Sequence, residues 1–244
     1  MKKALELSAN SINDSTHEGR GGCLQSRGSE QGADFTLANG NMMIDQAVII
    51  ICAYLLGCVN TGYYLVRFWA KTDIRTLASG GTGSRNVGRA LGTKGFLCTL
   101  IGDAGKGAVA VWLANQSGAP DWLAVAALLA AVAGHIFPVQ LGFRGGKGFA
   151  TLAGGLALLA PALLLTGFGF SLVFLALTRR STKSGLLALC CTPAITAIWR
   201  VRDGLTLLSA DFILYILLVL LVLFGHRDNI RKDFFGVQPA ATLE

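Results

Sequence analysis

Long apolar runs follow one another from residue 44 onward, and most of them match the thickness of a bilayer's hydrocarbon core. A helix needs about 20 residues to cross that core. Hydrophobic residues make up 52% of the 244-residue chain and charged residues only 14%, whereas a soluble domain carries about 25% charged residues. Lipid offers no hydrogen bonds, so the backbone must satisfy itself, which favours helices. The alternating segments of a membrane barrel are not seen. The sequence therefore predicts an all-α integral membrane protein.

The apolar runs predict a bundle of about seven transmembrane helices. Residues 149–178 are too many for one upright helix and few for two. Pro161 divides this run, so we expect a hairpin of two short helices there. The other expected spans are residues 44–69, 95–115, 121–141, 185–199 and 210–225.

Basic residues gather in the loops that these spans place on one side, and the net charge is +7. The loop of residues 70–94 and its border are strongly basic, with Asp73 as the acid among them. The basic residues are Arg67, Lys71, Arg75, Arg85, Arg89 and Lys94. The positive-inside rule places this loop in the cytoplasm. It explains the charge better than nucleic-acid binding does, so no nucleic acid is expected as a partner. Some of these cations also suit an anionic substrate.

The same rule assigns residues 142–148, 179–183 and 226–232 to the cytoplasmic side. Arg200 and Arg202 would then lie on the opposite side, against the rule. This loop is the least consistent part of the expected topology.

The two ends of the chain differ from the membrane part. Residues 1–42 are polar, mixed in charge and poor in large apolar residues, so they bury too little surface to fold alone. They also lack the apolar core of a signal peptide. We expect a disordered extension over residues 1–42, a membrane domain over 43–235 and a short tail over 236–244. The six cysteines show no spacing typical of a metal site, so no metal is expected.

Three polar clusters fall on the predicted cytoplasmic side. They read "SGGTGSRNVGRALG" (79–92), "GFRGGKG" (142–148) and "GHRDNIRK" (225–232). Glycines let backbone N–H groups approach an anion, and Lys and Arg supply charge and directed donors for phosphate oxygens. Three such clusters on one side predict a shared phosphate site.

Common nucleotide motifs do not fit these clusters. A Walker A loop needs Ser or Thr after its Gly-Lys pair, but Gly148 follows Lys147 and Gly107 follows Lys106. The first cluster does not give GxGxxG, and no strand precedes it. Nucleotide binding of either common type is therefore disfavoured.

The three clusters resemble a known family. "SGGTGSRNVGRALG", "GHIFPVQLGFRGGKGFAT" and "HRDNI", in this order, are similar to the three motifs of the bacterial acyl-phosphate:glycerol-3-phosphate acyltransferases, the PlsY family. The resemblance covers roughly residues 45–233. It implies an inner-membrane enzyme of seven helices with its active site facing the cytoplasm. It also implies acyl transfer from a fatty acyl phosphate to the 1-hydroxyl of glycerol 3-phosphate, giving lysophosphatidate and phosphate in phospholipid biosynthesis, without a cofactor.

The resemblance also implies roles for individual residues. Ser79, Arg89 and Lys147 match positions that hold the acceptor's phosphate, and His226 and Asn229 match the motif that orients the glycerol. We expect Arg89, Lys147, His226 and Asn229 to carry catalysis. The residues expected to bind substrate are Ser79, Gly80, Gly83, Asn86, Gly145, Gly146 and Gly148.

This chain departs from the family pattern in places. Gly81 stands where the family usually has Asn, and Ser84-Arg85 replaces Ala-Thr. Asp228 replaces a common Glu. Losing an amide and a hydroxyl while gaining a guanidinium affects the substrate details more than the reaction class.

The sequence does not settle the roles of three further polar residues. Asp103 and Lys106 share one helical face, and Asp103 lies about 12 Å into its expected helix. Ionisable groups at such depth are costly and often functional, so a structural ion pair and a catalytic role are both open. His135 is expected to be a hydrogen-bonded core histidine near the site.

The residues also leave two mechanistic alternatives. His226 has a suitable pKa range to accept the hydroxyl proton, and the substrate's phosphate is the other candidate. A transporter for a phosphorylated anion would use the same cations, but transporters often show duplicated halves, and none is seen. A relative that kept the fold without this activity is a further alternative.

Overall fold

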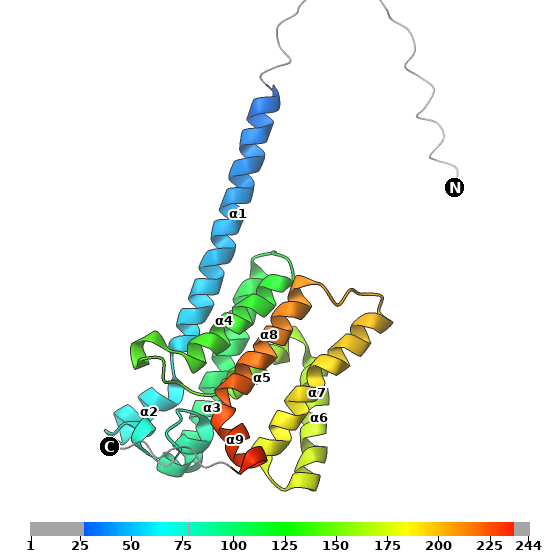
Figure 1. The fold of residues 1–244 in the computed structure, drawn as a ribbon. Helices are drawn as coiled ribbons and strands as arrows, with labels where there is room; N and C mark the ends of the chain where they lie inside the picture. The colour runs from blue at the N-terminus through cyan, green and yellow to red at the C-terminus, as the bar shows by residue number, and fades with distance from the viewer. Residues whose placement is uncertain (1–26, 78, 237–244) are drawn as a thin grey trace, which may run out of the picture. The chain divides into compact units, whose positions relative to one another are not determined.

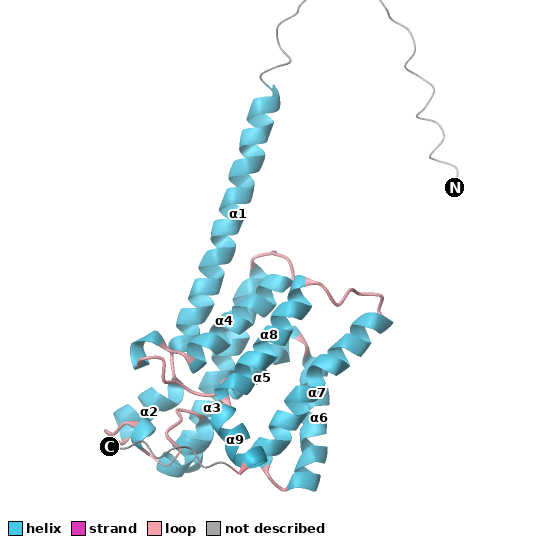
Figure 2. Cartoon of the chain, in the orientation of Figure 1, coloured by secondary structure: helices cyan, strands magenta, loops and turns pink. Residues whose placement is uncertain are grey.

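A computed structural model describes residues 27–236 except Ala78, with side chains from Met43 onward. Regular structure in these ranges is helical throughout (Figures 1 and 2). The chain divides into two units, Met1–Met43 and Ile44–Glu244, and the second contains the membrane bundle. The elements are α1 (Arg27–Cys58), α2 (Thr61–Trp69), η1 (Ile74–Thr76), α3 (Ser84–Gln116), α4 (Trp122–Ile136), η2 (Val139–Leu141), α5 (Phe149–Leu159), α6 (Pro161–Thr178), α7 (Ser181–Arg202), α8 (Ala210–Gly225) and α9 (Arg227–Phe235).

The predicted ends lie largely outside the described residues. Residues 1–26 and 237–244 are not described, and residues 27–42 belong to α1. The predicted boundaries at 42/43 and 235/236 stay predictions.

Five helical segments are long and apolar enough to cross a membrane. They are Met43–Trp69, Ser84–Gln116, Trp122–Leu141, Pro161–Thr178 and Ser181–Arg202. The pair α8 and α9, bent by 68°, gives a sixth if it is one span, and α5 is a shorter apolar helix. This confirms the all-α membrane class, and each of the seven predicted spans corresponds to a helical segment. The hairpin breaks before Pro161 as predicted, but only α5 is short.

Small residues bring α3 and α5 into close contact. A Cβ on Gly107 would lie 2.0 Å from the Thr151 carbonyl oxygen, and one on Gly154 would lie 1.9 Å from that of Ala104. Only glycine permits this approach, as at many interfaces between membrane helices. The contact fixes α5, and with it the second polar cluster, against α3.

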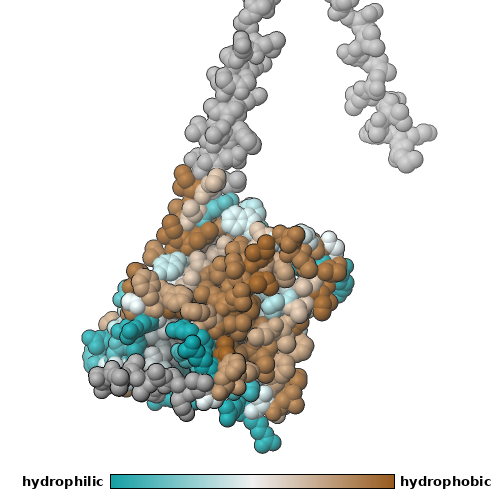
Figure 3. Space-filling model, in the orientation of Figure 1, coloured by the Kyte–Doolittle hydropathy of each residue, from teal (hydrophilic) through white to brown (hydrophobic). Residues whose placement is uncertain are grey.

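Apolar side chains cover the flanks of the helices (Figure 3). In α6, Leu163 is buried, whereas Leu165, Phe168 and Leu177 are each more than 60% exposed. Contiguous apolar surface of this extent requires a non-aqueous environment. Lipid supplies that environment for α6.

Three local features differ from the predicted topology. α3 begins at Ser84 and bends at Gly92 (φ 69°), so part of the predicted loop is helical. The first predicted span breaks between Cys58 and Thr61. Residues 227–235, predicted as part of a tail, form α9.

Acidic partners accompany the arginines that conflicted with the charge rule. Arg200 donates to Asp211 Oδ2 at 2.5 Å and to Ser209 Oγ at 2.6 Å, and Arg202 pairs with Asp203 at 3.1 Å. The positive-inside rule counts Lys and Arg residues whatever their acidic neighbours, so these partners do not change the count. Arg200 and Arg202 stay the exception to the rule in the predicted topology.

Candidate active site

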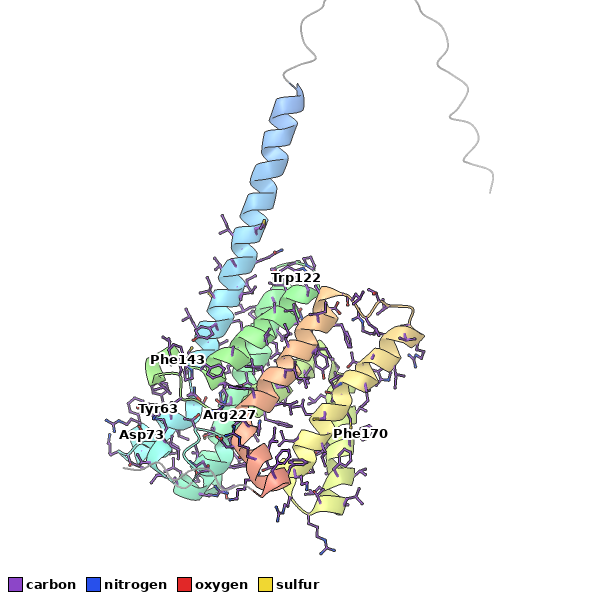
Figure 4. The ribbon with its side chains drawn as sticks, viewed as in Figure 1. Tyr63, Asp73, Trp122, Phe143, Phe170 and Arg227 are labelled. Atoms are coloured by element: carbon purple, nitrogen blue, oxygen red, sulfur yellow. The ribbon has the colours of Figure 1, made fainter. Side chains whose placement is uncertain are left out.

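The first and third polar clusters lie at one end of the helical bundle, and the second contacts the third through Lys147 and Asn229. α2, the start of α3 and α9 are together there (Figure 1). Figure 4 places the labelled Tyr63, Asp73 and Arg227 at this end and Trp122, at the start of α4, at the other. Segments that are far apart in the sequence thus lie close together in the fold (Figure 1).

The side chain of Asn86 holds the backbone of the first cluster in place through hydrogen bonds. Its amide nitrogen donates to the carbonyl oxygens of Leu77 (3.0 Å) and Gly81 (2.9 Å), and more weakly to that of Ile74 (3.3 Å). Its Oδ1 accepts the N–H of Ser79 at 3.3 Å. The hydrogen bonds of this buried amide are therefore made to the backbone. Asn86 shapes the loop that carries Ser79 and Gly80, and both of its N–H groups are used by the backbone in this geometry.

The other residues of the first cluster form the entry to α3. Gly80 has φ 67°, a conformation that glycine adopts without strain, and Ser79 is exposed beside it. Gly83 is the N-cap of α3, and its carbonyl accepts the N–H of Asn86 at 2.9 Å. The loop thus presents Ser79 and Gly80 outward.

Arg75, which pairs with Asp73, links the segment before the first cluster to Leu141, the residue before the second cluster. Arg75 contacts both carboxylate oxygens of Asp73, the shortest contact being 2.7 Å, and donates to the Leu141 carbonyl at 3.0 Å. Hydrogen bonding from Arg75 lowers the pKa of Asp73. The pair is partly exposed, so its main effect is to fix the relative position of the two loops.

Arg85 and Arg89 line a cavity of about 400 Å³ on α3. Its remaining lining residues are Gly88, Gly92, Thr93 and Phe96. Residues four apart lie on one helical face, so both guanidinium groups border the same space. Arg85 also donates to Thr182 Oγ1 at the start of α7, at 2.6 Å. Two guanidinium groups beside a cavity can bind a phosphate or a larger anion.

The glycines of the second cluster have two different roles. The N–H groups of Gly145 and Gly146 donate to the carbonyls of Ile136 (3.1 Å) and His135 (3.0 Å), so they hold the loop and are not free for an anion. Gly148, at φ 82°, is the N-cap of α5. The first N–H groups of a helix have no partner inside it, and such an end attracts anions. The backbone N–H groups that could bind an anion are therefore those at the start of α5, in place of those of Gly145 and Gly146.

Lys147 joins the second cluster to the third. Its Nζ donates to Asn229 Oδ1 in α9 at 2.6 Å. Burial lowers the pKa of Lys147, and the charges of Arg85 and Arg89 lower it further, while Asp228 and Asp233 oppose the shift. Lys147 is therefore hydrogen-bonded to the third cluster and influenced by the charges of the first.

His226 lies at the bend between α8 and α9. Its Nδ1 is 2.9 Å from the Val222 carbonyl oxygen, and the ring meets Phe149 edge-on with centroids 6.0 Å apart. A carbonyl only accepts, so Nδ1 carries the proton and Nε2 has a free lone pair. A neutral imidazole held in this tautomer can accept a proton through Nε2.

Three polar residues of this end were not singled out from the sequence. Asn60, at the break after α1, accepts from Thr82 Oγ1 at 2.7 Å and donates to the His135 carbonyl at 3.3 Å. Thr182 holds Arg85. For Asn60, the available signal was an amide interrupting an apolar run. Nothing local distinguishes Thr82 or Thr182 from other small polar residues.

The comparison with protein families bears on the transporter alternative. Residues 47–236 match the family described as glycerol-3-phosphate acyltransferase. The chain belongs to this family. Membership disfavours the transporter alternative. Among the described residues, no group of His, Cys, Asp and Glu is placed to hold a metal ion.

Curated relatives are similar over most of their length. A glycerol-3-phosphate acyltransferase 1 from Desulfitobacterium hafniense (strain Y51) is 44% identical over 194 residues, 78% of this chain and 91% of the relative. A glycerol-3-phosphate acyltransferase from Synechococcus sp. (strain JA-2-3B'a(2-13)) is 39% identical over 198 residues, 81% of this chain and 95% of the relative.

Two crystal structures share the fold. Both are of PlsY (YgiH), an integral membrane glycerol 3-phosphate acyltransferase, and each covers 80% of this chain and 94% of its own. The glycerol 3-phosphate form gives a TM-score of 0.69 at 29% identity. The lysophosphatidic acid form gives 0.67 at 28% identity.

Proposed function

We propose that this chain transfers a fatty acyl group from an acyl phosphate to the 1-hydroxyl of glycerol 3-phosphate. The products are lysophosphatidate and inorganic phosphate. The observation that carries this proposal is the hydrogen bond from Lys147, just before α5, to Asn229 in α9, with the charges of Arg85 and Arg89 also acting on Lys147. The site supplies cations for two phosphorylated reactants that repel each other.

The residues divide into groups with different tasks. Ser79, Arg89 and Lys147 bind the phosphate of glycerol 3-phosphate, and the start of α5 receives that of the donor. Gly145 and Gly146 fix the loop, and Gly148 turns it into α5. Asn229 holds Lys147 and orients the glycerol.

The reaction is one acyl transfer. The 1-hydroxyl oxygen forms a bond to the acyl carbonyl carbon, and the bond from that carbon to the phosphate oxygen breaks. His226 Nε2 takes the hydroxyl proton, since Nδ1 is committed to Val222, and returns it to the leaving phosphate. Holding the reactants together can supply about 7–11 kcal/mol of the barrier. Cations and the α5 N–H groups stabilise the oxyanion.

The protein is proposed to lie in the bacterial inner membrane with this site facing the cytoplasm. Support comes from the uneven distribution of charge over the two ends. The site end carries Arg67, Lys71, Arg75, Arg85, Arg89, Lys94, Arg144, Lys147, Arg179, Arg180, Lys183, Arg227, Arg231 and Lys232. The opposite end carries Arg200 and Arg202, both with acidic partners. Basic residues favour the cytoplasmic side.

A product assay tests the activity. Purified protein in micelles receives palmitoyl phosphate and glycerol 3-phosphate, and lysophosphatidate and free phosphate are measured together. We expect both products in equal amounts, with no product when either substrate is omitted. Phosphate release without lysophosphatidate, or no product at all, would refute the proposal.

A further inference from the structure

Asp103, Lys106 and His135 form a buried polar cluster directly behind the second motif. Their exposures are 1%, 5% and 3%. Lys106 Nζ lies 3.1 Å from Asp103 Oδ1 and 2.8 Å from His135 Nδ1. The reaction proposed above uses none of the three. Ionisable groups inside a membrane helix are costly and are kept where they have a task.

Lys106 connects the cluster to the break after α1. Its Nζ donates to the carbonyls of Gly57 at 3.0 Å and Val59 at 2.9 Å. The last carbonyls of a helix lack partners within it, so Lys106 caps this end from α3. Its third proton is directed at His135 Nδ1, and the Asp103 carboxylate balances the charge.

This arrangement fixes the tautomer and the place of the His135 ring. An ammonium group only donates, so Nδ1 of His135 accepts and its proton is on Nε2. His135 is the penultimate residue of α4, and the loop of the second motif folds back over it. The ring is thus anchored by α3 and presented to the loop.

His135 contacts the two loop glycines on both its backbone and its ring. Its carbonyl accepts the Gly146 N–H at 3.0 Å. A Cβ on Gly146 would lie 2.0 Å from His135 Nε2, and one on Gly145 would lie 2.1 Å from the His135 carbonyl oxygen. The loop therefore has room in this place only because its glycines lack side chains, and His135 sets how closely it approaches α4.

We propose that Asp103, Lys106 and His135 are positioning residues that set the second-motif loop, and with it the start of α5, for the donor's phosphate. The inference rests on the proposed function, in which that end of α5 receives the acyl phosphate. The cluster acts through Gly145 and Gly146 without touching the substrate. Its loss should therefore affect the donor more than the acceptor: Lys147 lies in the same loop, but its Nζ is also held by Asn229 in α9, and Ser79 and Arg89, which bind the acceptor's phosphate with it, lie in the first cluster.

Two variants and one control test this by steady-state kinetics in micelles. Lys106→Met removes the ammonium group, which donates the hydrogen bonds, and keeps a side chain of similar length. His135→Asn keeps a hydrogen-bond acceptor near the position of Nδ1 but removes the ring that lies against Gly146. Thr192→Val is the control, because it removes a buried 2.6 Å hydrogen bond from Tyr215 elsewhere in the bundle. We expect KM for palmitoyl phosphate to rise at least tenfold in both variants, with KM for glycerol 3-phosphate within threefold of wild type.

The control should leave both KM values within twofold. Wild-type turnover is measured alongside, so failure of the proposed function appears as an inactive wild type and is separate from failure of this inference. If the two KM values rise together in the variants, or if neither changes, the positioning role is wrong.

A double variant keeps the test decisive if Lys106→Met does not fold. Gly146→Ala places a methyl group against the His135 ring, and the donor KM should rise at least tenfold. With the ring removed by His135→Asn, adding Gly146→Ala should raise the donor KM less than threefold further. Losses that simply multiply would overturn the proposed contact between ring and loop.

Discussion

Lys147 is held by a neutral partner, which leaves its charge for the substrate. An amide accepts its hydrogen bond at 2.6 Å, whereas a carboxylate in the same place would neutralise the ammonium. Asp228 and Asp233 act on Lys147 only through their charge. The side chain is therefore positioned for a phosphate without being compensated by the protein.

Replacing this partner by a carboxylate tests that interpretation. Asn229→Asp should raise KM for glycerol 3-phosphate at least tenfold, which corresponds to about 1.4 kcal/mol. The reason is that the introduced carboxylate competes with the substrate's phosphate for Lys147. Asn229→Ala is the control that removes the hydrogen bond without adding charge. Equal KM values for the two variants would contradict the account.

The lowered pKa of Lys147 predicts the alkaline limb of the pH profile. Burial disfavours the ammonium form, so the cation is lost at a lower pH than for an ordinary lysine, whose pKa is about 10.4. Because phosphate binding needs the cation, kcat/KM for glycerol 3-phosphate should fall as pH rises through this lowered pKa. Lys147→Arg stays charged to higher pH, so its residual activity should lose the limb. An unchanged limb would show that another group titrates.

Residue roles were only partly predictable from the sequence. The motif residues were identified by their types and spacing. The occupation of Asn86 by four backbone groups, and of the Gly145 and Gly146 amides by α4 carbonyls, depends on how the loops fold back. Local sequence carries no information on those partners.

At the scale of elements, close approach of α3 and α5 sets the position of the anion-binding helix end. Gly107 and Gly154 allow the two backbones to meet. The buried helix α4 completes the core, where Leu128 and Val132 are fully buried. Widening the α3–α5 interface would move the start of α5 relative to Arg89.

A matched pair of glycine variants tests the interface. Gly154→Ala introduces a Cβ 1.9 Å from the Ala104 carbonyl oxygen, whereas Gly105→Ala meets no atom within 4 Å. We expect Gly154→Ala to lower the thermal unfolding temperature and the activity. Gly105→Ala should leave both unchanged or raise the stability by up to about 1 kcal/mol, as helix propensity predicts. Similar effects of the two substitutions would exclude a tight α3–α5 contact.

Hydropathy located the helices and Pro161 marked the break between α5 and α6, but the other interruptions were missed. The seven predicted runs each correspond to helical segments, because a bilayer requires long apolar stretches. The break after Cys58 was not predictable, since Lys106 and Gln140 cap its carbonyls from other parts of the chain. The first turns of α3 are polar, and six of the nine residues of α9 are charged or Asn, so a search for apolar runs misses them.

For the whole molecule, charge separates the two ends of the bundle. The proposed site end is basic, and the arginines of the α7–α8 loop are paired with acids. The Asp103–Lys106 pair lies between the ends and is internally compensated. This distribution is the basis for the proposed orientation.

Cysteine accessibility tests that orientation. In intact cells, a membrane-impermeant maleimide should label Asp203→Cys in the α7–α8 loop and leave Lys232→Cys in α9 unlabelled until the cells are opened. The parent chain controls for the native cysteines, of which Cys52, Cys98 and Cys190 are exposed. Labelling of Lys232→Cys in intact cells would place the site outside and contradict the orientation.

The central claim is that the three motifs form one site, and a double-mutant cycle between Arg89 and Lys147 tests it most directly. The measured quantity is kcat/KM for glycerol 3-phosphate in wild type, Arg89→Ala, Lys147→Ala and the double variant. Groups that act as a unit are strongly non-additive, and each single loss should be about 10²-fold or more. The account predicts a double variant little worse than either single variant. Losses that multiply in the double variant would show that Arg89 and Lys147 act independently.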